Sequence, residues 1–261
     1  MSQQAPLFLK RVLITRQAEQ AKSFTAAIQN LGGIPLTVPV LSFVPAVNRE
    51  GIQRVLEQLH TYQWIIFTSQ NGVDFFYQWL NLLNIHSSLA KSCKVAVVGK
   101  KTGEALKKRG VEPDVTPEEY VAESLLEALV KEANPHEKIL VVRGNLARPI
   151  LLRGLDEKGY RVTDLVMYET VQNKASMTEL QRAVEQADII TFTSSSTVNF
   201  FVDMMDSKQD WLSVINEKVV VCIGPITAQT AAKYEIEHIV PEEYTINGMI
   251  EKMVDYFKGN N

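Results

Sequence analysis

The stretch Val12-Leu13-Ile14-Thr15-Arg16 returns later in the chain as Ile139-Leu140-Val141-Val142-Arg143. Three more stretches repeat in the same order and at nearly the same separation: Phe67-Thr68-Ser69 as Phe192-Thr193-Ser194, Val98-Gly99 with Thr102 as Ile223-Gly224 with Thr227, and Pro117-Glu118-Glu119-Tyr120 as Pro241-Glu242-Glu243-Tyr244. Four matches in one order indicate an internal duplication. We therefore expect two related lobes with a ligand cleft between them.

Composition places the chain among ordinary globular proteins. It has 261 residues, of which 46% are apolar and 22% charged, and this length suffices for two domains. The net charge of −3 argues against a nucleic-acid partner. An acidic ligand remains possible where basic groups are concentrated locally.

The sequence also predicts a cytoplasmic protein without a membrane anchor. The N-terminus, Met1-Ser2-Gln3-Gln4-Ala5-Pro6, has no basic segment followed by an apolar run. No apolar stretch approaches the roughly 18 residues that span a bilayer. Cys93 and Cys222 adjoin expected strands, so we expect buried free thiols and no disulfide.

Short apolar runs predict buried strands at 12–14, 64–67, 94–98, 139–142, 189–192 and 219–223. Phe24, Ala27, Ile28 and Leu31 share one helical face, and Gly32-Gly33 ends that helix. In the second copy, a helix passes through Ile150, Leu151 and Leu155. Strands that alternate with amphipathic helices predict an α/β fold, in which parallel sheets are flanked by helices on both faces.

Two segments, 36–44 and 160–171, are long, extended and only partly apolar. Pro35 and Pro39 make the first a poor central strand. Because the segments are equivalent in the two copies, we expect crossovers that pair antiparallel, so that each lobe takes its first strand and helix from the other half. The alternative is two contiguous domains divided near Asn134-Pro135.

Ligands of parallel sheets bind where the strands end, beside helix N-termini. The residues expected there are rich in hydroxyls, backbone amides and arginine, without clustered carboxylates: Thr15-Arg16, 68–72, 99–102, 143–145, 193–197 and 224–227. Such loops suit anions. The alternative for each Ser or Thr is capping of the helix that follows.

Several common sites are missing. The sequence has neither a dinucleotide-binding nor a P-loop glycine motif. His60, His86, His136 and His238 lie far apart and are expected at the surface, so a metal site is not indicated. Ser194-Ser195-Ser196 has no base nearby in sequence, which argues against a covalent serine mechanism.

Tyr168 lies on the second crossover segment, in Val166-Met167-Tyr168-Glu169-Thr170. A tyrosine is a protonated donor at neutral pH, so it could hold a leaving hydroxyl or act as a weak general acid. The alternative interpretation is that Tyr168 is an ordinary strand tyrosine whose ring packs against its neighbours.

Together these patterns resemble uroporphyrinogen-III synthases over the whole chain, from about Lys10 to Tyr256. The resemblance rests on the ordered, spaced set 12–16, Phe67-Thr68-Ser69 with Asn71-Gly72-Val73, Val98-Gly99 with Thr102, 140–144, Tyr168-Glu169-Thr170, Phe192-Thr193-Ser194, and Ile223-Gly224-Pro225 with Thr227. It implies two α/β lobes joined by a two-stranded antiparallel ladder, with the active site in the cleft. The expected domains are 1–36 with 172–261 and 47–161, and the linker strands are 37–46 and 162–171.

The resemblance also implies the reaction. Linear hydroxymethylbilane loses water and closes to uroporphyrinogen III with ring D inverted, in heme biosynthesis and without a cofactor. Tyr168 would assist departure of the hydroxyl, and Thr102 and Thr227 would face the cleft. The implied substrate-binding residues are Arg16, Ser69, Asn71, Arg143, Arg148, Ser194, Ser195 and Gly224. The implied state is a monomer, with transient contact to the preceding pathway enzyme possible.

One departure from the family pattern follows Arg143-Gly144, where Pro149 stands in place of an acid. We expect this proline at the first position of a helix, where it does no harm. A two-lobe module that closes on a small anion is the competing interpretation of the chain. A pure binder would not need a proton donor at Tyr168.

Overall fold

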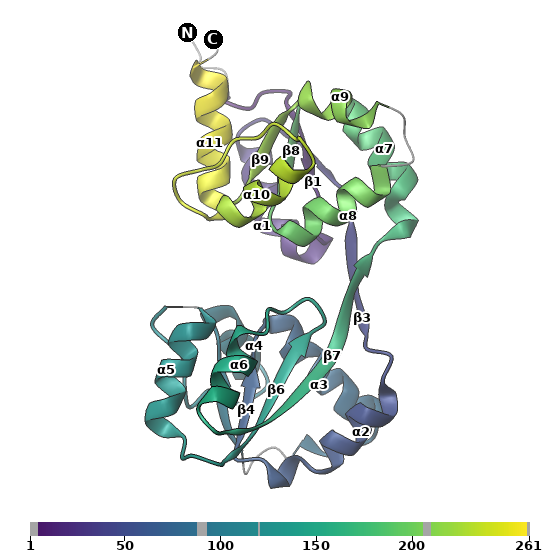
Figure 1. Cartoon of the computed structure of the whole chain (residues 1–261). Coiled ribbons are helices and arrows are strands. Elements are labelled where there is room, and N and C mark those ends of the chain that lie inside the picture. Colours follow the sequence, from purple (N-terminus) through teal and green to yellow (C-terminus); the bar gives the residue numbers. More distant parts are fainter. Residues whose placement is uncertain (1–4, 88–92, 120, 206–209, 260–261) are drawn as a thin grey trace. The chain divides into compact units, whose positions relative to one another are not determined.

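A computed structural model describes residues 5–87, 93–119, 121–205 and 210–259. The first four residues and Tyr120, on which part of the sequence analysis rests, lie outside the described residues. The chain forms two compact units (Figure 1). Unit 1 comprises Met1–Ser42 with Val171–Asn261, and unit 2 comprises Phe43–Thr170.

Unit 1 is built on a four-stranded sheet in the order β2 (Ile34–Thr37), β1 (Arg11–Ile14), β8 (Ile189–Phe192) and β9 (Val219–Cys222). Its strand pairs β2–β1, β1–β8 and β8–β9 are parallel, and β1 pairs with β8 from the other half of the chain. The helices of this unit are α1 (Ala18–Asn30), α7 (Met177–Gln186), α8 (Ser195–Met205), α9 (Trp211–Asn216), α10 (Pro225–Lys233) and α11 (Ile246–Gly259), with a short 3-10 turn at Lys174–Ser176.

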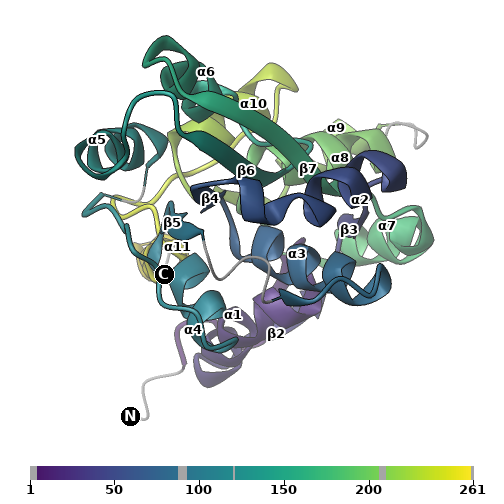
Figure 2. The same cartoon turned by 90° about the horizontal axis from the view of Figure 1, so that it is seen from below.

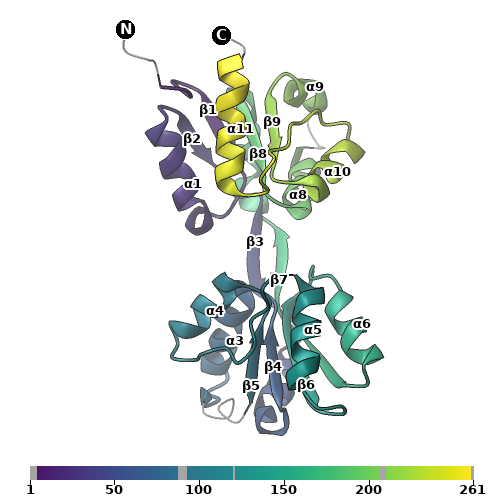
Figure 3. The ribbon, with the colours of Figure 1, turned by 90° about the vertical axis from the view of Figure 1, so that its left-hand side faces the viewer.

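Alternation along the strands divides the core of unit 1 into two layers. Val12 and Ile14 pack with Phe24 of α1 and with Met249 and Met253 of α11. The opposite face packs against α7, α8, α9 and α10, and Leu13, Ile190 and Phe192 belong to it. Figure 3 shows α11 in front of this sheet. Both faces are therefore covered, as a parallel sheet requires.

Unit 2 repeats the plan. Its sheet has the order β3 (Leu41–Pro45), β7 (Arg161–Gln172), β6 (Lys138–Gly144), β4 (Trp64–Phe67) and β5 (Lys94–Val97), and β4 to β7 are parallel. One face carries α5 (Ala122–Glu132) and α6 (Ile150–Glu157), and the other carries α2 (Arg49–Glu57), α3 (Gln70–Leu82) and α4 (Lys100–Lys107) (Figure 2). A 3-10 turn at Leu59–Thr61 follows α2.

Strands β3 and β7 neighbour each other and run in opposite directions. The Ala46 amide donates to the Met167 carbonyl at 3.2 Å, and the Asn173 amide donates to the Val40 carbonyl at 3.0 Å. The residue number rises along one strand as it falls along the other. These two bonds support the antiparallel pairing predicted for the crossover segments.

The predicted α/β class is confirmed, and each of the six apolar runs forms a strand. Helix α1 buries Phe24 and Ile28 and ends before Gly32, whose φ of +80° suits glycine. Cys93 and Cys222 are buried thiols, as expected. Within the described residues, no helix is long and apolar enough to span a membrane.

Two details of the sequence analysis were wrong. Pro149 is the N-cap of α6 and not its first helical residue, because the helix begins at Ile150. The Pro149 carbonyl still accepts the first helical bond, from the Arg153 amide at 3.0 Å, so the proline costs no hydrogen bond. His238 is half-buried, with Nδ1 2.9 Å from the Ile236 carbonyl oxygen, whereas the other three histidines are exposed.

Candidate functional site

A pocket of about 370 Å³ lies in unit 2, where its parallel strands end. Thr68 and Ser69 follow β4, Val98 follows β5, and Gly144 ends β6, so the parallel register brings these residues to one edge of the sheet. The complete lining is Thr68, Ser69, Val98, Val121, Ala122, Gly144, Leu146, Ala147, Arg148, Leu151, Tyr168 and Thr170.

The electrostatics of this pocket favour an anion. Ser69 is the N-cap of α3, Val121 is the N-cap of α5, and Leu151 is the second residue of α6. Three helix N-termini, each with a partial positive charge, therefore flank the pocket. Arg148 is the one charged residue in the lining, and it is exposed. Among the described residues, no hydrogen-bond or ion-pair partner is assigned to it.

Tyr168 places its hydroxyl at the wall of this pocket. The side chain is 7% exposed, and its Oη lies 3.0 Å from Ser69 Oγ. Burial raises the pKa of Tyr168, and hydrogen bonds with Ser69 and Asn71 partly oppose that shift. The phenol is therefore protonated at neutral pH and able to donate a hydrogen bond.

The ring of Tyr168 is also packed, as the alternative interpretation from the sequence expected. Phe75 stacks on it at a centroid distance of 5.1 Å and an interplanar angle of 18°. Phe43 meets it edge-on at 5.6 Å. The aromatic neighbours hold the ring, while the hydroxyl faces Ser69 and the pocket.

Capping accounts for part of the polar loops, as the alternative interpretation had it. Ser69 Oγ accepts from the Gly72 amide at 3.0 Å, and Ser194 Oγ accepts from the Thr197 amide at 3.2 Å. Thr68 donates to the Val142 carbonyl at 3.2 Å. Ser69 combines capping with the contact to Tyr168, because a hydroxyl oxygen accepts and donates at once.

The duplicated arginines differ in their surroundings. Arg143 forms two bonds of 2.6 Å with the carboxylate of Asp164 and a third, of 3.0 Å, with the Gly144 carbonyl. These contacts with Asp164 raise the pKa of Arg143 and use most of its donors. Arg16 is half-buried, and it donates a long hydrogen bond of 3.5 Å to Gln20. Burial lowers the pKa of Arg16.

The other predicted residues lie at the matching edge of unit 1 or inside helices. Ser195 Oγ accepts from Thr230 at 2.8 Å and donates to the Ile226 carbonyl at 3.2 Å. Gly224 is the N-cap of α10. Thr102 and Thr227 each occupy the third position of a helix, and they are 5% and 4% exposed. Neither threonine belongs to the lining of the unit 2 pocket.

Sequence reasoning missed several residues around Tyr168. Phe43 and Phe75 hold its ring, and Asn145 binds the backbone beyond it. Phe75 belongs to the pair Phe75-Phe76, which returns in the second copy as Phe200-Phe201, but this repeat does not reveal which strand residue the ring meets. Asn145 stands directly after Arg143-Gly144, and this position at a strand end was the available signal.

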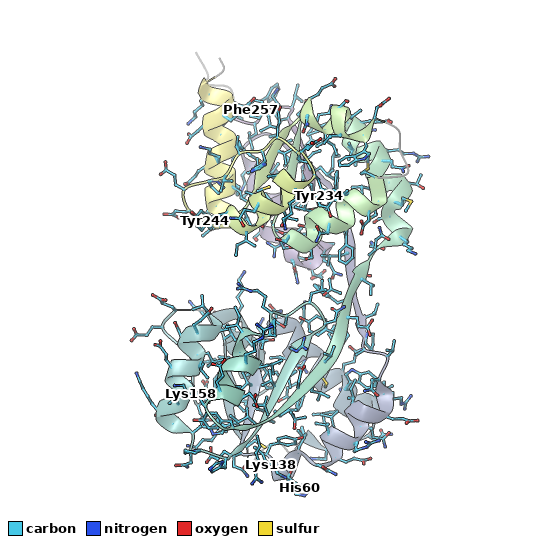
Figure 4. All side chains as sticks on the ribbon, in the orientation of Figure 1. His60, Lys138, Lys158, Tyr234, Tyr244 and Phe257 are labelled. Atoms are coloured by element: carbon cyan, nitrogen blue, oxygen red, sulfur yellow. The ribbon has the colours of Figure 1, made fainter. Side chains whose placement is uncertain are left out.

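The opposite edge of the unit 2 sheet carries different residues. Figure 4 shows Lys138, the first residue of β6, and His60 at the edge where the strands begin. His60 is thus remote from the pocket, which lies where the strands end. Among the described residues, no group of three or more His, Cys, Asp or Glu side chains is placed to hold a metal ion.

The fold and the pocket define a class: a duplicated α/β protein with an anion-favouring pocket and a buried tyrosine donor at the ends of its strands. The chain belongs to the uroporphyrinogen-III synthase (HemD) family, whose model matches residues 22–251. Enzymes of this family close linear hydroxymethylbilane to uroporphyrinogen III in tetrapyrrole biosynthesis.

Similar proteins agree with this assignment. The chain is 32% identical to the putative uroporphyrinogen-III synthase of Methanocaldococcus jannaschii, over 92% of the chain and 96% of that protein. It is 29% identical to the porphyrin biosynthesis protein HemD of Ruminiclostridium josui, over 98% of the chain but only half the length of that relative. A crystal structure of mutant uroporphyrinogen III synthase from Thermus thermophilus shares the fold, with a TM-score of 0.64, 20% identity and coverage of 97% and 100%.

Proposed function

We propose that this chain is a uroporphyrinogen-III synthase. It converts hydroxymethylbilane into uroporphyrinogen III, releasing the hydroxyl of ring A as water, inverting ring D and closing the macrocycle. We propose that the reaction needs no cofactor, because the chemistry consists of proton transfer, ionisation, and carbon–carbon bond formation and cleavage, without a net oxidation or reduction.

The observation that carries this proposal is the Tyr168 hydroxyl, 3.0 Å from Ser69 Oγ in a pocket whose one charged lining residue is Arg148. Loss of hydroxide from ring A is assisted when a donor holds the departing oxygen. A buried phenol that stays protonated is such a donor. We assign this role to Tyr168.

The substrate is rich in carboxylates, and the site supplies groups that bind them. We propose that Arg148, Ser69 and Asn71 bind acetate or propionate groups together with the amides at the start of α3. In unit 1, we assign the same task to Arg16, Ser194, Ser195 and the Gly224 backbone. Thr102 and Thr227 are proposed to act near the reacting rings. Because Arg143 is tied to Asp164, its contribution would be through the Gly144 carbonyl that it also binds.

Inversion of ring D is proposed to follow from positioning. The ionised ring A must be attacked through the substituted carbon of the terminal pyrrole, which gives a spiro intermediate that fragments and recloses. A site that holds the bilane in this geometry selects the inverted isomer. Exclusion of water protects the cation from recapture.

We further propose the molecular setting of this activity. The two lobes, 1–36 with 172–261 and 47–161, are joined by linker strands 37–46 and 162–171. The protein acts as a monomer in the cytoplasm, and it receives its unstable substrate by transient contact with the enzyme that makes it.

An isomer assay tests the function. Hydroxymethylbilane made in situ is incubated with the purified protein, with chelator present and no added cofactor, and the oxidised products are separated. We expect mainly the type III isomer, and much less of it from Tyr168→Phe. If the type I isomer alone forms, as in a protein-free control, the bilane closes by itself and the proposed function is wrong.

A further inference from the structure

The direction of Tyr168 depends on an irregularity in β7. In a regular strand, neighbouring side chains point to opposite faces of the sheet. Leu165 and Met167, two residues apart, belong to the core shared with α2, α3 and α4, against which the partly buried Val166 also packs. Tyr168, the very next residue, belongs to the same core. Regular alternation would have turned its ring toward α5 and α6 instead.

A β-bulge explains the exception. Arg143 of β6 pairs with Val166, but the next residue, Gly144, pairs with Tyr168. Met167 is therefore the extra residue on β7, and Tyr168 changes face at this point. A slip of the register by one residue would reverse this and remove the hydroxyl from Ser69.

Hydrogen bonds hold the bulge from both sides. Before Tyr168, the Met167 carbonyl accepts from Trp79 Nε1 at 2.8 Å and from the Ala46 amide at 3.2 Å. After Tyr168, strand β6 has ended at Gly144, and Asn145 takes over its task. The Asn145 amide donates to the Tyr168 carbonyl at 3.2 Å.

The side chain of Asn145 extends this pairing by one more residue. Its Oδ1 accepts from the Thr170 amide at 2.8 Å, and its Nδ2 donates to the Thr170 carbonyl at 3.5 Å. The side-chain amide thus imitates a strand residue beyond the end of β6. We call this pair of hydrogen bonds between the Asn145 side chain and Thr170 the clasp. Because Asn145 is exposed and lies outside the core, the clasp does not contribute apolar burial.

We infer that Asn145 is a positioning residue: its side chain clasps Thr170, fixes the bulged register of β7 and so aims the Tyr168 hydroxyl at Ser69 and the pocket. The consequence for turnover rests on the proposed function of Tyr168. The structural consequence, the orientation of the ring, does not.

The first test is steady-state turnover of Asn145→Ala. Misplacement of a reacting group by about 1 Å costs on the order of 100-fold in rate, so we expect kcat to fall by about 10- to 100-fold with KM nearly unchanged. Asn145→Asp keeps the acceptor for the Thr170 amide, so kcat should recover. Its new negative charge beside an anionic substrate should raise KM.

Asn216 offers a matched control. It makes the same two kinds of bond in unit 1, donating to the Glu235 carbonyl at 3.0 Å and accepting from the Glu237 amide at 2.9 Å. Asn216→Ala therefore loses an equivalent clasp far along the chain from Tyr168. We expect wild-type kcat from it. Equal losses of kcat in Asn145→Ala and Asn216→Ala would mean general destabilisation and would overturn the inference.

A second readout needs no activity. In protein with isotope-labelled tyrosine rings, the NMR signal of Tyr168 is assigned as the one that is absent from the spectrum of Tyr168→Phe. The neighbouring rings of Phe75 and Phe43 should shift this signal away from that of a free tyrosine. We expect Asn145→Ala to move this signal toward that of a free tyrosine and Asn216→Ala to leave it in place. An unmoved signal in Asn145→Ala sinks the inference, even if the wild type makes type III isomer. If the wild type makes no type III isomer, the proposed function is wrong. The NMR result would still test whether Asn145 orients the Tyr168 ring.

Discussion

Replacement of Gly144 by alanine should drive Tyr168 out of place. A Cβ atom at position 144 would lie 2.5 Å from Cζ, 2.6 Å from Cε2 and 2.8 Å from Oη of Tyr168. Carbon atoms in favourable contact are about 3.5–4.0 Å apart, so the new methyl group overlaps the phenol by about 1 Å. Gly144 is therefore required for close approach and not for backbone freedom.

Neighbouring aromatic rings restrict how far the Tyr168 ring can move away from this methyl group. Phe75 stacks on it at 5.1 Å, and Phe43 closes it edge-on at 5.6 Å. Either the ring leaves Ser69 or β6 and β7 move apart at the bulge. Overpacking of this kind costs about 1–3 kcal/mol, and displacement of the hydroxyl should reduce type III turnover by about 100-fold.

Denaturant unfolding and the isomer assay measure the two effects of Gly144→Ala separately. Gly154→Ala is the matched control, because a Cβ there would crowd only the flexible end of Leu126 and lies away from Tyr168. The double variant Gly144→Ala with Tyr168→Ala removes the overlap. Its loss of stability should therefore be smaller than the sum of the losses measured for the two single variants. Wild-type stability and turnover in Gly144→Ala would refute the reasoning.

Four further outcomes follow from the same geometry. Tyr168→Phe keeps the packed ring, so the free energy of unfolding should change little while kcat falls by about 10²- to 10⁴-fold; an equal loss of affinity, measured by calorimetry with the product, would contradict a catalytic role. Burial raises the pKa of Tyr168 from its ordinary 10.0, so the phenol stays protonated below that pH. The pH–rate profiles of the wild type and of Tyr168→Phe should therefore have the same shape below pH 10. A wild-type rate that falls well below pH 10, while the rate of the variant does not, would argue against this protonation state. Arg148→Gln should raise KM and weaken its dependence on salt, with kcat retained, because Arg148 supplies charge at the pocket; an unchanged KM would remove Arg148 from the binding set. Cys93 and Cys222 should resist a thiol reagent in the folded protein and react in denaturant, since both are buried and the pKa of Cys222 is raised to about 12; rapid labelling of the native protein would contradict this.

The elements of the fold could be predicted because their causes are local. The run Trp64–Phe67 is apolar at every position, and Ile189–Phe192 is apolar except at the buried Thr191, as expected of strands buried on both faces. The polar edge followed from the same reasoning, because residues after parallel strands meet at one place. The contacts of Tyr168 could not be predicted, because Phe75, Asn145 and Gly144 reach it through tertiary structure. The bulge at Met167 leaves no trace in the hydrophobic pattern, and it decides which face the tyrosine occupies.

The pairing of Arg143 with Asp164 shows how far the two copies have diverged. In unit 2, Val141 pairs with Asp164, and in unit 1 its counterpart Ile14 pairs with Thr37. A carboxylate thus neutralises Arg143, whereas the equivalent strand position beside Arg16 carries a hydroxyl. Arg16 is left with a long bond to Gln20, so it is the better candidate for a substrate carboxylate.

The second divergence concerns the strand that carries Tyr168. Strand β7 continues through its bulge from Arg161 to Gln172, whereas the equivalent stretch of the first copy is interrupted between β2 and β3 at Pro39, which lacks an amide donor. The spacing that relates Arg16 to Arg143 relates Leu41 to Tyr168, and leucine has no hydroxyl to donate. The chemistry that we propose for Tyr168 therefore belongs to one copy. The groups that we propose to bind carboxylates come from both copies, and this arrangement suits a substrate that has one leaving group and many carboxylates.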